Sequence, residues 1–337
     1  MIRVGVIGCG YWGPNLVRNF TEASGSTVAR VSDLNPARLR SIGSRYPGIQ
    51  TTTDYRDLLK DKALDAVAIA TPASSHYALA MEALQAGKHV LVEKPLTASS
   101  TEAERLVEEA GRRNLILMVD HTFVYTGVVR KIRELTFSGK LGDLYYFDSV
   151  RVNLGLFQQD VNVIWDLAVH DLSILDYVLP VHACAVSATG VKHFPGGTEN
   201  IAYITLFFES SLIAHVHVNW LAPVKVRRTL IGGSKQMIVY DDLENSEKLK
   251  VYDKGITFDN DLETVYKALV SYRTGDMWAP KTDSTEALLV EANHFIHCVG
   301  SGERPITDGE AGLRVVRILE AATESMKHQG ALVKLAG

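Results

Sequence analysis

The chain has 337 residues, 46% of them hydrophobic and 22% charged, with a formal net charge of −4. This composition is typical of a globular protein with two domains, and it gives no reason to expect nucleic acid or a membrane as partner. Because no leader, no long apolar run and no C-x-x-C pattern is seen among three widely spaced cysteines, we expect a cytoplasmic protein without a metal site.

The first expected element is a short apolar strand over residues 3–7, followed at once by Gly8, Gly10 and Gly13 and then by a helix. This is G-x-G-x-x-G in the context of strand before and helix after. Gly8 permits the tight turn, Gly10 lets a pyrophosphate approach, and Gly13 allows close packing. A second apolar run ends in Asp33, where a carboxylate can accept ribose hydroxyls. The pattern predicts a dinucleotide site; a glycine-rich turn beside an ordinary exposed aspartate is the alternative.

Two aromatic residues, Tyr11 and Trp12, lie inside this glycine loop. They are expected to contact the pyrophosphate, and packing at the helix start is the alternative. Asp33 should repel a 2′-phosphate, so NAD is the expected cofactor. NADP remains possible because Arg38, in the next expected helix, could reach an adenosine phosphate.

Further apolar strands are expected over residues 65–70, 88–92 and 115–119, with helices between them, one of them starting at a capping box of Ser99 and Glu102. This alternation predicts a parallel, doubly wound sheet. Ligands bind such sheets beyond the carboxyl ends of the strands. The residues that follow those ends are Gly8 to Gly13, Asp33, Thr71, Pro72, Glu93, Lys94, Pro95 and His121.

The pattern changes near residue 122. Helices are expected over 128–137 and 165–179, a strand over 144–153 and a polar loop over 154–163. Strand candidates without helices between them then follow, and they predict a mainly antiparallel sheet: 183–193, 200–208, 211–221, 226–232, 236–240 and 248–253. Residues 254–283 appear as an irregular stretch, and helices over 284–299 and 307–327 close the chain, the last with a capping box of Thr307 and Glu310.

The expected fold class is therefore α/β. A Rossmann domain with a doubly wound parallel sheet over residues 1–122 precedes an α+β domain with an open, mainly antiparallel sheet over residues 123–337. The strands from 183 to 253 lack helices to cover an apolar face, and an exposed apolar face is usually an interface. A homodimer or homotetramer is expected.

Three residues could carry acid–base chemistry. Lys94 at a strand end would face nicotinamide and substrate, although a surface lysine beside a glutamate is an equal alternative. Asp166 and His170 are four residues apart and share a helix face, which suits removal of a hydroxyl proton. A salt-bridged aspartate with a satisfied histidine is the alternative, and a metal site lacks a third ligand.

Four other histidines are weaker candidates. His76 is expected near the cofactor, with a structural role nearly as plausible, and His121 should face the same cleft. His215 and His217 share one strand face and are interpreted as sheet residues.

With these motifs the chain resembles the GFO/IDH/MocA oxidoreductase family over essentially its whole length. The resemblance rests on Gly8–Gly13, Ala70-Thr71-Pro72 with His76, Glu93-Lys94-Pro95 and Asp166-x-x-x-His170. It implies NAD(H) or NADP(H), a sugar or cyclitol substrate, oligomers built sheet against sheet, and Lys94, Asp166 and His170 at the reacting carbon. The segment from Arg151 to Asn162 looks like that of nucleotide-sugar 3-dehydrogenases and 3-ketoreductases.

The motifs and the resemblance together give two sets of candidate site residues. The cofactor set comprises Gly8, Gly10, Tyr11, Trp12, Gly13, Asp33, Thr71, Pro72, His76, Glu93 and Lys94. The substrate set comprises Lys94, His121, Arg151, Asn153, Asn162, Asp166 and His170. A free-sugar or inositol dehydrogenase of the same family is the alternative, and a non-enzymatic dinucleotide-binding regulator is a second one, disfavoured because Lys94, Asp166 and His170 are all present.

Overall fold

The computed structural model describes residues 1–155, 161–258 and 270–335. The chain forms two compact units, residues 1–126 with 284–320 and residues 127–283 with 321–337. The domain boundary expected between residues 122 and 123 stays a prediction, and residues 284–320 join the first unit although they were expected in the second domain.

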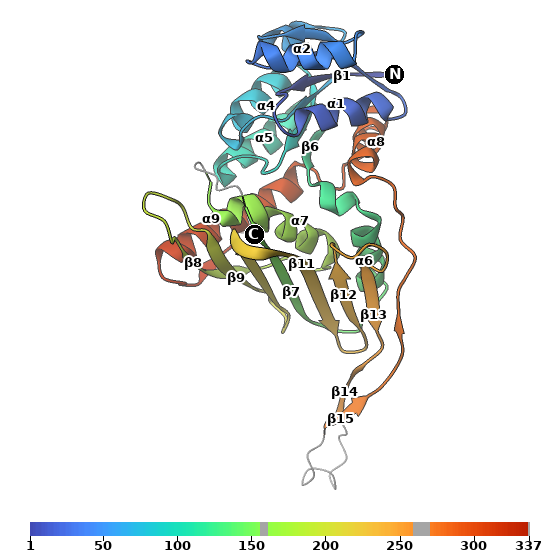
Figure 1. Ribbon diagram of the computed structural model, residues 1–337, viewed down its shortest axis with the longest axis vertical. Helices are drawn as coiled ribbons and strands as arrows, with labels where there is room; N and C mark the ends of the chain where they lie inside the picture. Colours follow the sequence, from blue (N-terminus) through green and yellow to red (C-terminus); the bar gives the residue numbers. More distant parts are fainter. Residues whose placement is uncertain (156–160, 259–269, 336–337) are drawn as a thin grey trace. The chain divides into compact units, whose positions relative to one another are not determined.

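The first unit is built on a six-stranded parallel sheet (Figure 1), as the strand and helix alternation predicts. Its order is β3-β2-β1-β4-β5-β6. The strands are β1 (Ile2–Ile7), β2 (Ser26–Ser32), β3 (Gln50–Thr52), β4 (Ala66–Ile69), β5 (His89–Glu93) and β6 (Leu117–Asp120). All four residues of β4 and of β6 are buried, as expected where helices cover both faces of a parallel sheet.

The helices of this unit are α1 (Gly13–Glu22), α2 (Pro36–Arg45), α3 (Arg56–Lys60), α4 (His76–Gln85), α5 (Ser100–Arg113) and α8 (Ala287–Ser301), with the short 3₁₀ turns η1 (Ala73–Ser75) and η2 (Thr122–Tyr125). α9 (Gly309–Lys327) runs from the first unit into the second. The expected cap of α5 is confirmed, because the Ser99 hydroxyl accepts a hydrogen bond of 3.3 Å from the Glu102 N–H.

The capping box expected at Thr307 and Glu310 is wrong. Asp308 caps α9 instead, since its Oδ1 accepts a hydrogen bond of 2.9 Å from the Ala311 N–H. The Thr307 hydroxyl donates to the Val119 carbonyl over 2.7 Å. The Thr307 hydroxyl, which the sequence pattern predicted as the cap of the helix, therefore bonds to a residue distant in sequence at the end of the sheet.

The second unit is built on a nine-stranded sheet with the order β16-β13-β12-β11-β7-β10-β9-β8-β17. Its strands are β7 (Leu144–Leu154), β8 (Ala185–Val191), β9 (Ile201–Phe207), β10 (Ile213–Asn219), β11 (Leu221–Gly233), β12 (Met237–Asp241), β13 (Leu249–Tyr252), β16 (Met277–Trp278) and β17 (Val333–Lys334). β7 and β10 are parallel and the other neighbours are antiparallel, so the expected mainly antiparallel sheet is confirmed.

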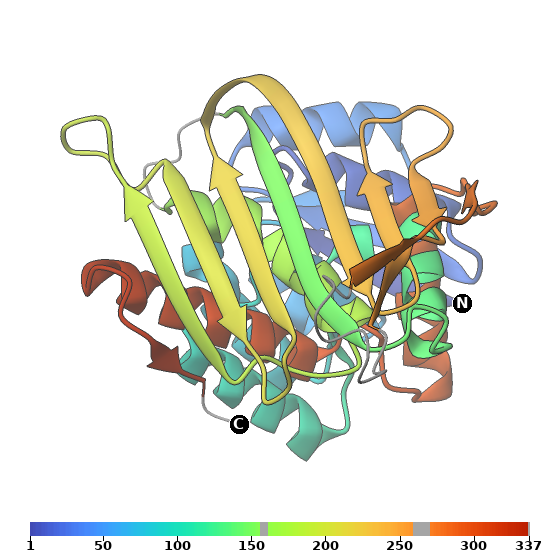
Figure 2. The ribbon, with the colours of Figure 1, turned by 90° about the horizontal axis from the view of Figure 1, so that it is seen from below.

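Helices α6 (Gly127–Phe137) and α7 (Val169–Val178) lie with the end of α9 against one face of this sheet. Figure 2 looks onto the other face, which no helix of the described chain covers. Along β10 the residues alternate between buried and accessible, as expected for a strand with one packed and one open face.

Two expectations for this unit need correction. The helix expected over residues 165–179 is in fact a π-helical turn, η3 (Ile164–Ala168), followed by α7. The stretch 254–283, expected to be irregular, contains the paired strands β14 (Gly255–Phe258) and β15 (Val270–Arg273) as well as β16. Short strands that gain stability from pairing carry little periodic signal of their own. Part of the polar loop expected over 154–163 lies outside the described residues.

No helix within the described ranges combines the length and hydropathy that crossing a bilayer requires.

Candidate active site

The glycine loop joins β1 to α1 and keeps backbone groups open at the start of that helix. Gly8 has a φ of +95°, and a Cβ there would lie 2.5 Å from the carbonyl oxygen of Ala70. A Cβ at Gly13 would overlap the carbonyl oxygen of Gly8. Trp12, at the N-cap of α1, makes no capping hydrogen bond through its side chain. The loop therefore fits a pyrophosphate bound by the first N–H groups of α1.

Tyr11 and Trp12 differ in exposure at the tip of this loop. Tyr11 is 86% exposed and Trp12 is 40% exposed, and their rings meet edge to face at 5.6 Å. Packing at the helix start does not account for the exposure of Tyr11. Contact of both residues with the cofactor stays a prediction.

Asp33 follows β2 and is almost fully buried beside the glycine loop. Its carboxylate accepts hydrogen bonds from the N–H groups of Cys9, over 2.6 Å, and of Asn35, over 2.7 Å. Arg38 Nη1 lies 3.6 Å from the same carboxylate. Burial, followed by the charge of Asp33, raises the pKa of the Cys9 thiol to about 12. The loop thiol is therefore protonated at neutral pH and is not a nucleophile.

Removing the charge of Asp33 or of Arg38, near the adenosine end of the cofactor, is expected to change the preference between NAD and NADP. We expect Asp33→Asn to raise the affinity for NADPH relative to NADH by roughly tenfold or more, because it removes a negative charge that repels a 2′-phosphate. Arg38→Ala should act in the opposite direction. Calorimetric titration of both cofactors measures the ratio. Tighter binding of NADPH than of NADH to the unmodified chain would show that Asp33 does not face the ribose.

His76 connects two loops at the carboxyl ends of β4 and β5. Its Nδ1 lies 2.8 Å from the Pro95 carbonyl oxygen and its Nε2 lies 2.8 Å from that of Thr71. Burial lowers the pKa of the ring. A neutral ring has one N–H and donates it to one of these two carbonyl oxygens, so His76 lies between two backbone segments, which supports the structural alternative. The expected cofactor contacts of Thr71, Pro72 and His76 stay predictions.

Lys94 directly follows β5 and is half-buried. The preceding residue, Glu93, is only 7% exposed and pairs in the parallel register with Asp120 of β6. His121 comes next and is 2% exposed. Lys94 and His121 therefore follow neighbouring strand ends, on the edge of the sheet that also carries the glycine loop. Their substrate contacts, and the cofactor contact of Glu93, stay predictions.

Asp166 and His170 lie in the second unit, where both are half-buried. Asp166 belongs to the π-helical turn η3 and His170 to the first turn of α7. The indole Nε1–H of Trp220, itself 1% exposed, donates to Asp166 Oδ2 over 3.0 Å. A fixed carboxylate four residues before an accessible imidazole suits proton transfer. π-Helical turns occur frequently at functional sites.

Three expected substrate contacts lie near this turn. Arg151 on β7 is 3% exposed, and its Nε donates to Asp171 of α7 over 2.6 Å, so this buried pair ties sheet to helix. Asn153 is two residues further along β7 and therefore points to the same face. Asn162 Oδ1 accepts from the Ile164 N–H over 3.2 Å and from the Trp165 N–H over 3.3 Å, just before the π-helical turn. Substrate contact by these three stays a prediction, and part of the segment from Arg151 to Asn162 lies outside the described residues.

His215 and His217 lie on β10, where their rings stack on Tyr203 at 6.0 and 4.4 Å. This placement confirms their interpretation as sheet residues. Among the described residues, no group of three histidine, cysteine or carboxylate side chains could hold a metal ion.

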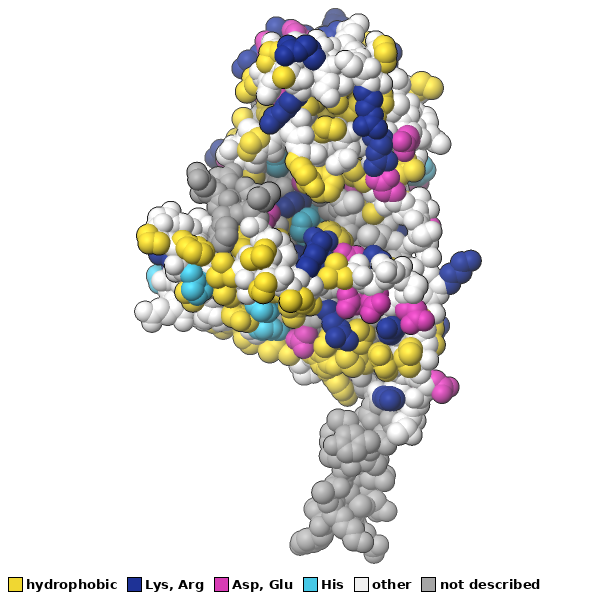
Figure 3. All heavy atoms as spheres, in the orientation of Figure 1, with side chains coloured by type: hydrophobic (Ala, Val, Ile, Leu, Met, Phe, Trp, Pro, Cys, Tyr) yellow, Lys and Arg dark blue, Asp and Glu magenta, His cyan; other side chains and the backbone are white. Residues whose placement is uncertain are grey.

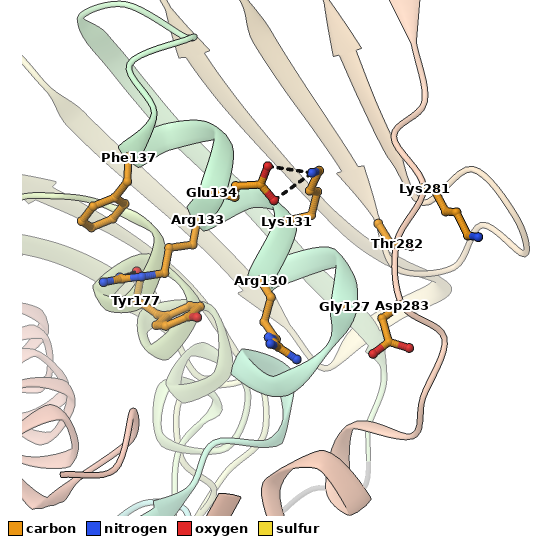
Figure 4. Close-up of a pocket in the computed structure, with 10 residues that line it drawn as sticks. All are labelled: Gly127, Arg130, Lys131, Arg133, Glu134, Phe137, Tyr177, Lys281, Thr282 and Asp283. Atoms are coloured by element: carbon orange, nitrogen blue, oxygen red, sulfur yellow. Dashed lines mark hydrogen bonds and ion pairs between the residues drawn. The ribbon is translucent and has the colours of Figure 1, made fainter. Parts of the chain in front are cut away.

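A separate hollow of about 560 Å³ opens on the second unit beside α6 (Figure 4). The Arg133 guanidinium lies over the rings of Phe137 and Tyr177, 4.0 and 4.5 Å from their centroids. Lys131 is paired with Glu134 at 2.8 Å. These contacts hold the side chains to one another, and none of the residues predicted for catalysis lines this hollow.

Comparison with known proteins identifies the family. The model of the family described as "Oxidoreductase family, NAD-binding Rossmann fold" matches residues 2–121, and the model of the GFO/IDH/MocA C-terminal domain matches residues 129–239. The chain belongs to the GFO/IDH/MocA oxidoreductase family. It is thus an NAD-binding dehydrogenase or reductase, as the glycine loop and the resemblance predict.

Relatives with different substrates match this family member over nearly its whole length. It is 28% identical to the UDP-N-acetylglucosamine 3-dehydrogenase of Acidithiobacillus ferrooxidans over 94% of both chains. It is 25% identical to the myo-inositol 2-dehydrogenase of Thermotoga maritima over 97% of both chains. A solved structure of the Acidithiobacillus ferrooxidans enzyme superposes with a TM-score of 0.81 at 25% identity, covering 97% of this chain and 98% of that one.

Proposed function

We propose that this family member transfers a hydride between NAD and C3 of a nucleotide-linked hexose. The observation that carries the proposal is the placement of Lys94 on the same edge of the NAD-binding sheet as the glycine loop. An accessible ammonium at a strand end suits binding of a sugar hydroxyl beside a nicotinamide. The nucleotide-linked substrate is supported by the likeness to the UDP-N-acetylglucosamine 3-dehydrogenase.

Each proposed catalytic residue has a distinct role. NAD, when bound, accepts the hydride in the direction of oxidation. His170 accepts the proton of the substrate hydroxyl, and Asp166, fixed by Trp220, orients the imidazole. Lys94 donates a hydrogen bond to the same hydroxyl oxygen and stabilises the negative charge that develops there. In the direction of reduction, His170 returns the proton to the new alkoxide.

A free-sugar or inositol dehydrogenase is the second candidate, supported by the likeness to a myo-inositol 2-dehydrogenase. A substrate panel separates the two. NADH fluorescence should rise with a UDP-, dTDP- or GDP-hexose and stay flat with the free hexoses and inositols under the same conditions. If myo-inositol or a free sugar gives the highest kcat/KM instead, the nucleotide-linked substrate is excluded.

We also propose that the protein assembles as a homodimer or homotetramer through the uncovered sheet face. Tyr203 and Ile213 on this face are 44% and 45% exposed, although both are large and hydrophobic. Figure 3 shows hydrophobic side chains gathered along the lower part of the second unit. Burial of such a face against a second copy removes apolar area from water, at about 25 cal/mol per Å².

Light scattering should therefore give a mass at least twice the 37.0 kDa of one chain. Ile213→Asp is expected to lower that mass, because it places a charge in the proposed interface. Ile306→Asp is the matched control, since Ile306 is 41% exposed but belongs to the first unit. A single-chain mass for the unmodified protein would rule out this assembly.

We propose a cytoplasmic location because the three cysteines form no disulfide. Cys9, Cys184 and Cys298 are all free, and Cys9 and Cys298 are buried. Free, unpaired cysteines are typical of proteins from a reducing compartment.

A further inference from the structure

A buried ion pair joins the nine-stranded sheet to α7, at the residue that follows His170. Arg151 of β7 donates from Nε to Asp171 Oδ2 over 2.6 Å and from Nη2 to Asp171 Oδ1 over 3.3 Å. Ser149, which lies on the same face of β7, donates from its hydroxyl to Asp171 Oδ1 over 2.7 Å. The exposed fractions are 3% for Arg151, 2% for Asp171 and 1% for Ser149. Three hydrogen bonds thus hold one buried carboxylate to the sheet.

The neighbouring strand β11 extends this network. The hydroxyl proton of Ser149 is engaged by Asp171, so in its contact of 3.3 Å with Thr229 the Thr229 hydroxyl is the donor. Thr229 is 3% exposed and is the register partner of Ser149. The Asp171 carboxylate is therefore fixed by side chains of two adjacent strands, on the face of the sheet that α7 covers.

Stability alone does not account for such a pair. Two charges lose their hydration when they are buried, and apolar residues of similar volume often stabilise a fold as well or better. Hydrogen bonds add direction, because they weaken steeply when the donor is out of line, whereas apolar contacts have no preferred direction. The planar guanidinium of Arg151 forms two bonds to one carboxylate, which fixes the orientation of that carboxylate.

The orientation of Asp171 limits where His170 points. Successive residues of an α-helix lie about 100° apart around its axis. Since Asp171 is bonded to β7, a rotation of α7 about its own axis would break the bonds to Arg151 and Ser149. His170 is half-buried and lies on the adjoining side of the helix. The bonds to Asp171 therefore restrict the directions that the imidazole can take.

The anchored aspartate follows a rare backbone conformation. The π-helical turn η3 carries Asp166 and ends directly before α7. Asn162, just before this turn, accepts two hydrogen bonds from its first backbone N–H groups. Asp171 holds the chain on the other side of the turn. Asp166 and His170 thus lie between two fixed points, which maintain their relative position across the change from π-helix to α-helix.

We propose that Arg151 is a positioning residue for the reaction, which holds the imidazole of His170 in its productive direction through Asp171. The inference rests on the proposed role of His170 as the acceptor of the substrate proton. The alternative is the direct substrate contact that the sequence predicts for Arg151. The two roles differ in their kinetic effect, because a positioning residue acts on kcat and a substrate ligand acts on KM.

Replacing the pair as a whole tests this role without leaving a buried charge. Arg151→Met together with Asp171→Leu exchanges both charged side chains for apolar ones of similar size, so the double variant should unfold at a denaturant concentration near that of the unmodified protein. Its kcat for the nucleotide-linked hexose should fall about 10- to 100-fold, as expected when a reacting group is misplaced. The KM for the sugar should change by less than about threefold.

Asp176→Asn is the matched control on the same helix. Asp176 lies further along α7, its side chain is 9% exposed, and it pairs with His182 beyond the end of the helix over 3.2 Å. Loss of this carboxylate should leave kcat and KM within about twofold of the unmodified enzyme. If the double variant does not fold, Arg151→Lys serves instead. It keeps the buried charge but cannot form the two parallel N–H bonds, so kcat should still fall several-fold, and an unchanged kcat overturns the proposal.

NMR of the histidine rings follows His170 without turnover. In protein labelled with ¹³C-histidine, the ring signal of His170 is assigned by its loss in His170→Asn. Relaxation of this signal should show a more mobile ring in the double variant than in the unmodified protein. His328, exposed and paired with Glu324 at 2.8 Å, is the internal reference and should relax equally in both.

The outcomes separate this inference from the proposed function. An unchanged kcat in the folded double variant overturns the proposal. A KM for the sugar that rises about tenfold or more also overturns it and identifies Arg151 as a direct substrate ligand. A lowered kcat with unaltered mobility of the His170 ring overturns it as well. If the unmodified enzyme turns over no sugar, the proposed function fails, while the ring mobility still decides whether the Arg151–Asp171 pair orders His170.

Discussion

Lys94→Met or His170→Asn is expected to lower kcat by roughly 10²–10⁴. Lys94 is half-buried at the strand-end edge of the NAD-binding sheet, and His170 follows an aspartate that Trp220 fixes. Both substitutions keep much of the side-chain volume. Lys94→Met removes the ammonium that binds the substrate hydroxyl, and His170→Asn removes the imidazole that accepts its proton. The affinity for NAD should change little, because the glycine loop and Asp33 are untouched. Stopped-flow turnover together with calorimetric titration of NAD measures both quantities.

Two controls match these substitutions. Lys131→Met removes a lysine from an exposed pair with Glu134 on α6, and His328→Asn removes a histidine from an exposed pair with Glu324. Exposed ion pairs contribute about 0–1 kcal/mol to stability, so both controls should retain near-normal turnover. A variant of Lys94 or His170 with the turnover of the unmodified enzyme would exclude that residue from the chemistry.

Gly13→Ala is expected to abolish measurable NAD binding and to lower the free energy of unfolding by about 1–3 kcal/mol. The new Cβ would overlap the carbonyl oxygen of Gly8, a backbone atom that cannot move without displacing the turn. The first turn of α1 would be pushed away from β1, and its N–H groups would no longer be aligned for the pyrophosphate. Chemical denaturation and fluorescence titration with NADH measure the two losses.

Gly43→Ala provides the matched control for this glycine. Gly43 lies in α2 of the same unit, and a Cβ there meets no atom within 4 Å. Alanine in a helix is more favourable than glycine by about 0.5–1 kcal/mol, so this variant should gain stability and keep its NAD affinity. Normal NADH binding by Gly13→Ala would mean that the loop does not carry the pyrophosphate.

Much of the first unit could be predicted because its signals are local. The strand ends, the glycine loop and the cap at Ser99 each depend on residues close together in sequence, and the parallel sheet then places Gly8, Asp33 and Lys94 along one edge. The mainly antiparallel sheet of the second unit could be predicted in the same way, from strand candidates that have no helices between them.

The remaining features depend on contacts that sequence spacing does not encode. The π-helical turn at Asp166 goes with a hydrogen bond from Trp220, more than fifty residues away in sequence. Arg151, which lies in the segment that resembles the nucleotide-sugar subgroup, pairs with Asp171 of a helix twenty residues further on. Each partner becomes evident only once the chain is folded.

The most direct test of the proposed function follows the hydride itself. The enzyme is incubated with NAD and a nucleotide-linked hexose deuterated at C3, and the NADH produced is analysed by mass spectrometry and NMR. Transfer from C3 predicts one deuterium at C4 of the nicotinamide ring and a slower rate than with the unlabelled sugar. Unlabelled NADH formed at the same rate from both sugars would contradict oxidation at C3, because the hydride would then come from another carbon.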